Sequence, residues 1–181
     1  MVSARGFTIV ELILVIGIIG ILTGGVIIAV NVPLQLAKAR DGQRKADLLK
    51  IASALELYKT DNNGYPCFPS GGCGWAAPSR SDMAPLLAPY TGVVPEDPSN
   101  PDDNCVSGKN PSYLYSVNGG GGPKGITYTL FANLENVSDA DAIKAKPAPI
   151  APGSSSDGNK TFTINAGTCN GFTYNYWINS P

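Results

Sequence analysis

The chain has 181 residues, 43% of them hydrophobic and 15% charged, which is enough for one modest globular domain and an additional segment. Its formal net charge of −1 argues against a nucleic-acid coat and against a polybasic membrane-binding protein. Histidine, the commonest general acid–base residue and zinc ligand, is absent, and the sequence contains no nucleophile elbow, phosphate loop or dinucleotide motif. We therefore expect neither an enzyme nor a nucleic-acid partner.

The first predicted element is an apolar helix with one carboxylate just inside its start. Residues 5–12 read RGFTIVEL, and the uncharged apolar run continues to Val30. As a helix, residues 12–30 would be roughly 28 Å long, enough to span a bilayer core, and too long for the apolar core of a secretory signal peptide. A carboxylate deep in such a segment costs roughly 2.5–3.5 kcal/mol, so we expect Glu11 to have a function. In the alternative, a plain transmembrane anchor, Glu11 would reach the cytoplasmic interface.

The Gly-Phe-Thr-x-x-Glu-Leu string that opens this run resembles the class III leader of type IV pilins and type II secretion pseudopilins. The resemblance implies that a prepilin peptidase removes residues 1–6 by cleaving between Gly6 and Phe7. It also implies that the new N-terminal Phe7 is N-methylated. In this family the carboxylate at the position of Glu11 pairs with the terminal amine of a neighbouring subunit, so Phe7 and Glu11 are the expected assembly residues. Residues 7–33 would be the transmembrane and polymerisation helix.

Residues that weaken a helix lie near the end of the apolar run. Gly24 and Gly25 have low helix propensity, and Pro33 would remove a backbone hydrogen bond to Ala29. We expect a kink here or, in a filament, a melted stretch, and the family resemblance supports melting.

Residues 34–62 are predicted to form an amphipathic continuation of the stalk helix. The apolar side chains that recur there at helical spacing are Leu48, Ile51, Ala52, Leu55 and Tyr58. One helix face can therefore pack on a sheet. The sequence DNNG at 61–64 ends the helix. Residues 44–66 resemble the stalk-to-head junction of the major pseudopilin and its pilin relatives.

Residues 63–181 are expected to form a globular head that begins with loops. The stretch 65–112 is rich in Pro, Gly, Ser and Asp, and has one possible short helix near 81–87. The proline-bracketed acidic stretch 94–98 resembles the loop that precedes the sheet in pseudopilins. Residues 144–159 read as a surface excursion between strands.

Four head segments read as strands. Residues 113–117 and 126–134 flank a glycine-rich turn and resemble the antiparallel hairpin of the family. Residues 161–164 and 172–178 are the other two. The predicted fold is therefore α+β. A long N-terminal α-helix, with a membrane half and an amphipathic half, packs on a small antiparallel β-sheet of three to four strands.

Four cysteines follow the apolar run, namely Cys67, Cys73, Cys105 and Cys169. If the N-terminus is cytoplasmic, they face an oxidising compartment and are disulfide candidates. Of the three possible pairings, the local pair Cys67–Cys73 is favoured, which leaves Cys105 for Cys169. Zinc is disfavoured because neither Cys-x-x-Cys spacing nor histidine is present.

Charged residues separate between stalk and head. The stalk has Lys38, Arg40, Arg44, Lys45 and Lys50, and the head has Glu96, Asp97, Asp102 and Asp103. This separation would help subunits stack head to stalk, or both sets are simply solvated surface.

The head has two candidate ligand sites, each with a simpler alternative. Some pseudopilins bind calcium near their C-terminus, where this chain has Asp139, Asp141 and Asp157, and the density of acidic residues makes Asp97, Asp102 and Asp103 a second candidate set. Their spacing matches no established calcium loop, so no cofactor is expected and solvated loops are favoured. The aromatic residues Tyr174, Tyr176 and Trp177 would form either a stacking platform or, more commonly, part of the core.

The sequence thus predicts a structural subunit that polymerises into a type IV pilus or a type II secretion-like filament. The hairpin favours the secretion pseudopilin, whereas the long 65–112 segment and the cysteines favour a pilin. The other possibility is a non-polymerising, membrane-anchored sensor or adhesin domain. The implied partners are identical subunits, a prepilin peptidase, an assembly ATPase and an inner-membrane platform protein. The precursor would cross the inner membrane once with its head extracytoplasmic, and the filament would be periplasmic or at the cell surface.

Overall fold

The computed structural model describes residues 6–29, 31–67, 75–76, 78, 83–99, 113–119, 124–136, 138–143, 154–156, 161–163 and 173–181. The chain divides into two compact units, residues 1–36 and residues 37–181.

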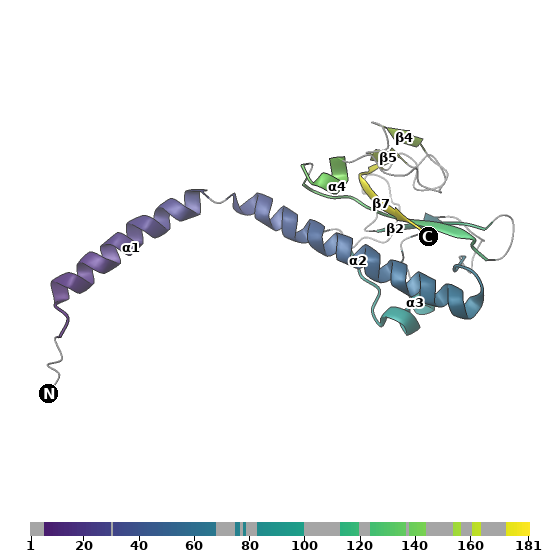
Figure 1. Ribbon diagram of the computed structural model, residues 1–181, viewed down its shortest axis with the longest axis horizontal. Helices are drawn as coiled ribbons and strands as arrows, with labels where there is room; N and C mark the ends of the chain where they lie inside the picture. The colour runs from purple at the N-terminus through teal and green to yellow at the C-terminus, as the bar shows by residue number, and fades with distance from the viewer. Residues whose placement is uncertain are drawn as a thin grey trace. The chain divides into compact units, whose positions relative to one another are not determined.

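Helix α1 (Ile9–Ala29) forms most of the first unit and is drawn in purple in Figure 1. Its backbone remains helical through Gly24 and Gly25. Within the described residues, no helix has both the length and the apolar character that crossing a membrane requires.

Two residues, Asn31 and one undescribed position, separate the end of α1 from the start of helix α2 (Val32–Asn62), so the stalk consists of two consecutive helices. Asn31 caps α2, because its Oδ1 accepts a 3.3 Å hydrogen bond from the Leu34 amide. Pro33 therefore lies in the first turn of α2, where a missing amide hydrogen costs little. Melting of this region in a filament stays a prediction.

The buried face of α2 is the one that the sequence periodicity predicts. Leu48, Ile51 and Leu55 have no exposed surface and belong to the main core cluster. The sheet lies along α2 in Figure 1. The sheet contributes the core side chains Tyr115, Val117, Tyr128, Leu130 and Ala132, and Tyr113, just before β2, also belongs to the core.

The main sheet is antiparallel throughout, with strand order β1-β2-β3-β7. Its strands are β1 (Trp75–Ala76), β2 (Leu114–Asn118), β3 (Thr127–Ala132) and β7 (Tyr176–Asn179). The predicted hairpin is β2–β3, and the α+β fold with a small antiparallel sheet is confirmed. Strand β3 is shorter than the predicted range 126–134, and Ile126, which precedes it, is 65% exposed.

A second antiparallel sheet has the order β4-β5-β6. Its strands are β4 (Ser154–Ser156), β5 (Thr161–Thr163) and β6 (Thr173–Tyr174). The prediction of one strand over 172–178 was wrong, because β6 and β7 belong to different sheets and separate at Asn175. The Asn175 amide explains the corner, since Oδ1 accepts from the Leu134 amide at 2.7 Å and Nδ2 donates to the Leu134 carbonyl at 2.9 Å. The reading of 144–159 as an excursion also missed β4.

Two short helices complete the described head. Helix α3 (Ala84–Thr91) corresponds to the predicted helix near 81–87, and Pro85 is tolerated in its first turn. Helix α4 (Ala140–Ile143) follows Asp139, whose Oδ1 accepts the Asp141 amide at 2.8 Å.

Candidate assembly site

Thr8 and Glu11 form a reciprocal cap at the start of α1. The Thr8 amide and hydroxyl donate to Glu11 Oε2 at 3.3 and 3.1 Å, and the Glu11 amide donates to Thr8 Oγ1 at 3.2 Å. This is the capping-box arrangement, which satisfies two otherwise free helix amides. It also places the carboxylate at the positive end of the helix dipole. Sequence reasoning found Glu11 but missed Thr8, although the Thr-x-x-Glu spacing signals such a box.

The predicted cleavage junction lies just before this cap. Gly6 and Phe7 are non-helical and exposed, with Phe7 80% accessible. A peptidase could therefore reach the bond between them without unwinding α1.

Between Ile9 and Leu22, the apolar side chains of α1 are exposed around the whole circumference of the helix. Those that expose more than two fifths of their surface are Ile9, Val10, Leu12, Ile13, Leu14, Val15, Ile16, Ile18, Ile19, Ile21 and Leu22. Burying one such side chain contributes roughly 1.5–3 kcal/mol. A continuous surface of this kind indicates a binding surface for another apolar body.

In the head, a buried ion cluster joins α2 to two distant loops. Arg44 is 3% exposed, and its guanidinium contacts Asp97 through Nε–Oδ2 at 2.7 Å and Nη2–Oδ1 at 2.9 Å. The same guanidinium contacts Asp41 Oδ1 at 2.8 Å and Glu135 Oε1 at 2.7 Å, and it also binds Ser99 Oγ. Arg40 donates from Nε to Glu135 Oε1 at 2.8 Å. We call these residues (Arg40, Asp41, Arg44, Asp97, Ser99 and Glu135) the Arg44 cluster.

Asp41 extends the Arg44 cluster to the backbone of the head. Its two carboxylate oxygens accept the amides of Glu135 and Asn136, each at 2.8 Å. With 1% of its surface exposed, Asp41 is more buried than Arg44, which is 3% exposed. The charges are thus fully hydrogen-bonded, which offsets the cost of removing them from water.

The electrostatics of the Arg44 cluster keep the carboxylates of Glu135 and Asp97 ionised. Hydrogen bonding to Arg40, and secondarily to Arg44, lowers the pKa of Glu135 to about 2, although partial burial opposes this. Burial acts to raise the pKa of Asp97, but hydrogen bonds from Arg44 and the Ser99 amide outweigh it and lower that pKa. Much of the predicted stalk-to-head charge attraction therefore operates inside one chain.

A second ion cluster involves two of the calcium candidates. Lys45 Nζ lies 2.7 Å from Asp139 Oδ1 and 2.6 Å from Asp141 Oδ2. The third candidate, Asp157, lies outside the described residues. In the described part of the chain, no three His, Cys, Asp or Glu side chains gather so as to hold a metal ion.

The other predicted site residues divide between the core and the undescribed segments. Tyr174 and Trp177 are 0% and 4% exposed, and their rings lie 5.6 and 6.4 Å from that of Phe131, so the core reading is confirmed over the stacking platform. Cys67 is disulfide-bonded. Its pairing stays a prediction, because Cys73, Cys105 and Cys169 lie outside the described residues, as do Asp102 and Asp103.

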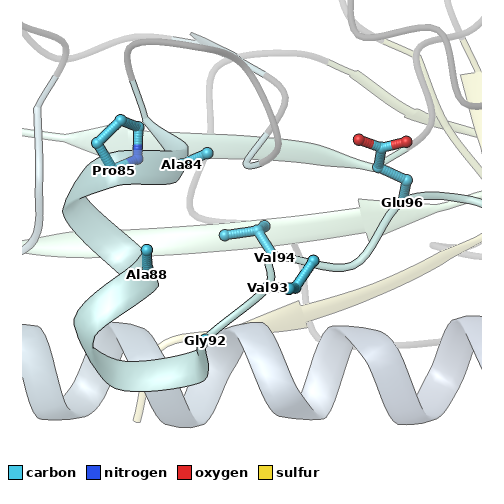
Figure 2. Close-up of a pocket in the computed structure, with 7 residues that line it drawn as sticks. All are labelled: Ala84, Pro85, Ala88, Gly92, Val93, Val94 and Glu96. Atoms are coloured by element: carbon cyan, nitrogen blue, oxygen red, sulfur yellow. The ribbon is translucent and has the colours of Figure 1, made fainter.

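The head also has an apolar pocket of about 400 Å³ between α3 and the loop that follows it. Its lining residues are Ala84, Pro85, Ala88, Gly92, Val93, Val94 and Glu96. Figure 2 shows Ala84, Pro85 and Ala88 on the helix, with Glu96 at the far end of the loop as the charged member. We call this the Glu96 pocket.

Comparison with known proteins gave consistent relatives. No family model and no solved structure matched the chain. It is 33% identical over 109 residues to the type II secretion system core protein G of Escherichia coli K12, covering 59% of this chain and 72% of the relative. It is 31% identical over 121 residues to the same protein of Pseudomonas aeruginosa, covering 64% and 84%. The match with the Pectobacterium carotovorum protein is 32% identical over 101 residues and spans 54% of this chain and 64% of that relative. On these matches, the chain belongs to the type II secretion system core protein G family, the family of the major pseudopilins.

Proposed function

We propose that this chain is a structural subunit of a type II secretion filament, and that it polymerises through its N-terminal apolar helix. The single observation that most supports this is the apolar surface of α1, exposed on all sides and headed by the carboxylate of Glu11. Family membership supports the same role and a membrane-associated or periplasmic location.

Assembly requires a processed N-terminus in this proposal. A prepilin peptidase cleaves the exposed bond between Gly6 and Phe7 and removes the leader 1–6, and Phe7 is then N-methylated. Residues 7–33 hold the precursor in the inner membrane and later form the filament core. Residues 34–62 complete the stalk, and 63–181 form the extracytoplasmic head. An assembly ATPase and an inner-membrane platform protein would drive the transfer from lipid to filament.

Glu11 sets the register between subunits in this proposal. In the isolated chain its Oε2 accepts both hydrogen bonds from Thr8, so the carboxylate is already held at the end of α1. In a filament it also neutralises the terminal amine of Phe7 on a neighbouring subunit. Burying that amine and that carboxylate separately would be expensive, whereas burying them as a hydrogen-bonded pair offsets both costs.

The experiment compares Glu11→Gln with Thr8→Val in cells that assemble filaments. Glutamine can still complete a capping box but has no charge, whereas Thr8→Val removes the two hydrogen bonds of the hydroxyl and keeps the charge. We expect Glu11→Gln to lose sheared filaments and Thr8→Val to retain them. The N-terminal peptide mass from the same cells should begin at Phe7 and be heavier by one methyl group.

Normal filaments from Glu11→Gln would overturn the charge-pairing role. A chain that keeps its leader and never enters the sheared fraction, whatever stands at position 11, would instead indicate a membrane-anchored sensor or adhesin domain.

A further inference from the structure

The charged side chains of the described head and of α2 are almost all satisfied within the chain. Besides the two ion clusters, Asp47 binds the Tyr113 hydroxyl, Asp61 binds the Tyr90 hydroxyl, and Lys50 binds the Val93 carbonyl. Among the described charged residues, only Lys38 and Glu96 make neither a hydrogen bond nor an ion pair inside the chain. They are exposed and of opposite sign.

Glu96 is the one charged residue that lines the Glu96 pocket, and the other lining residues are apolar. Val93, on the same wall, is 80% exposed. A carboxylate on the rim of an apolar wall matches the two parts of a lysine side chain. The aliphatic stem can pack on Val93 and Pro85 while the ammonium reaches the carboxylate.

Lys38 of the same chain lies too far along α2 to fill this pocket. The loop that contains Glu96 is tied to α2 between Arg44 and Lys50, through Arg44–Asp97 and Lys50–Val93. With a rise of 1.5 Å per residue, Lys38 lies roughly 9–18 Å before that level. A parallel second copy, displaced by that distance toward the C-terminal end of α2, would bring its own Lys38 level with Glu96.

We propose that Lys38 of one subunit docks into the Glu96 pocket of a neighbouring copy. The occupant is a second copy because, among the described residues, each chain has one unpaired charged side chain of each sign, Lys38 on α2 and Glu96 at the pocket. Such a contact is heterologous, so each subunit gives one group and receives one, and the contact repeats without closing. It therefore fits an open helical filament, and it rests on the polymerisation proposed above. The subunit rise along the filament should not exceed about 18 Å.

Charge reversal tests the pair. In parallel with the parent chain, Lys38→Glu and Glu96→Lys should each reduce the yield of sheared filaments roughly tenfold, because like charges would face one another. The double variant should recover parental yield. Lys38→Arg should assemble normally, and Lys38→Glu combined with Lys124→Glu should not be rescued. Circular dichroism of each variant should remain parental, since both side chains are exposed.

A cross-linking experiment tests whether Lys38 and Glu96 of neighbouring subunits lie close together. Lys38→Cys and Glu96→Cys chains are expressed together and treated in filaments with a short bismaleimide, because residues joined by a salt bridge are too far apart for a disulfide. A cross-linked dimer that needs both variants is expected, with Lys38→Cys plus Lys124→Cys as the unreactive control. Filaments that form without this dimer, and a double variant that stays defective, would overturn the docking contact alone. Absence of filaments from the parent chain would instead count against polymerisation itself.

Discussion

Arg44 and Asp97, separated by 53 positions in the sequence, meet through two nearly parallel hydrogen bonds of 2.7 and 2.9 Å. This fork joins α2 to the loop before the sheet. Asp41 and Glu135 complete the surroundings of the guanidinium, so that one buried cation holds together three segments of the head.

Replacing Arg44 with methionine should destabilise the head strongly. The substitution leaves Asp41 and Asp97 buried without their partner, and breaking a buried pair in this way costs about 3–5 kcal/mol. Arg40→Met is the matched control, because Arg40 is 36% exposed, contacts Glu135 alone in the Arg44 cluster and should cost under about 1 kcal/mol. Denaturant unfolding of the full chain in detergent measures both. Equal losses would contradict the structural role of Arg44.

Acid should unfold the head over a defined range. The pKa of Glu135 is lowered from 4.5 to about 2 in the folded chain, so the folded state binds fewer protons than the unfolded state between these values. Its contribution to stability is complete above about pH 4.5 and is lost as the pH falls to about 2. Asp97, whose pKa is also lowered, acts in the same direction.

Glu135→Gln isolates this effect. The variant should be less stable than the parent at pH 7, and the difference should shrink on acidification until it disappears near pH 2. Denaturant midpoints, measured from pH 7 to pH 2, provide the test, and a difference that stays constant over this range would refute the assignment.

Gly125 should tolerate no side chain. Its amide and carbonyl pair with Tyr65 at 2.9 Å in both directions, and an added Cβ would lie 2.1 Å from Val117 Cγ2. Gly125→Ala should therefore cost about 1–3 kcal/mol or prevent folding. Gly42→Ala is the control on the exposed face of α2, where nothing lies within 4 Å, and it should stabilise the helix by about 0.5–1 kcal/mol. Thermal unfolding of the two variants distinguishes crowding from a general intolerance of alanine.

Calcium should not stabilise the parent chain through Asp139 and Asp141, because the Lys45 ammonium already pairs with both carboxylates. Lys45→Met removes that ammonium and should make the melting temperature rise with millimolar calcium and fall with chelator. Lys50→Met, which loses only a bond to a carbonyl, should show no calcium effect. A parent chain whose melting temperature rises with calcium as much as that of Lys45→Met would contradict this account.

The elements that could be predicted from sequence depend on local periodicity. Leu48, Ile51 and Leu55 define a helix face at any tertiary arrangement, and the β2–β3 hairpin follows from two β-rich segments around a glycine turn. The N-terminal site was found through its motif, because Glu11 is conspicuous among apolar neighbours. What it does in assembly is still a prediction.

The features that sequence reasoning missed depend on long-range partners. Nothing near Arg44 indicates that it will meet Asp97 and Glu135, so the separated charges looked like two surfaces rather than one buried cluster. The corner at Asn175 was missed for the same reason. It depends on hydrogen bonds between the side-chain amide of Asn175 and the backbone of Leu134, 41 positions away. Lys38 and Glu96 can be distinguished only in the structure, where every other described charged residue makes a hydrogen bond or an ion pair inside the chain.

The position of the Arg44 cluster has a mechanical consequence. A pull on the N-terminal helix would reach the head through the first turns of α2, where Asp41 and Arg44 are held by the Glu135 segment and by Asp97. Because these contacts lie at nearly the same level of α2, they would share the load and would have to break together. The strands farther along α2 would be shielded from tension until then. The force needed to unfold the head should therefore be set by these salt bridges, and it should fall in acid.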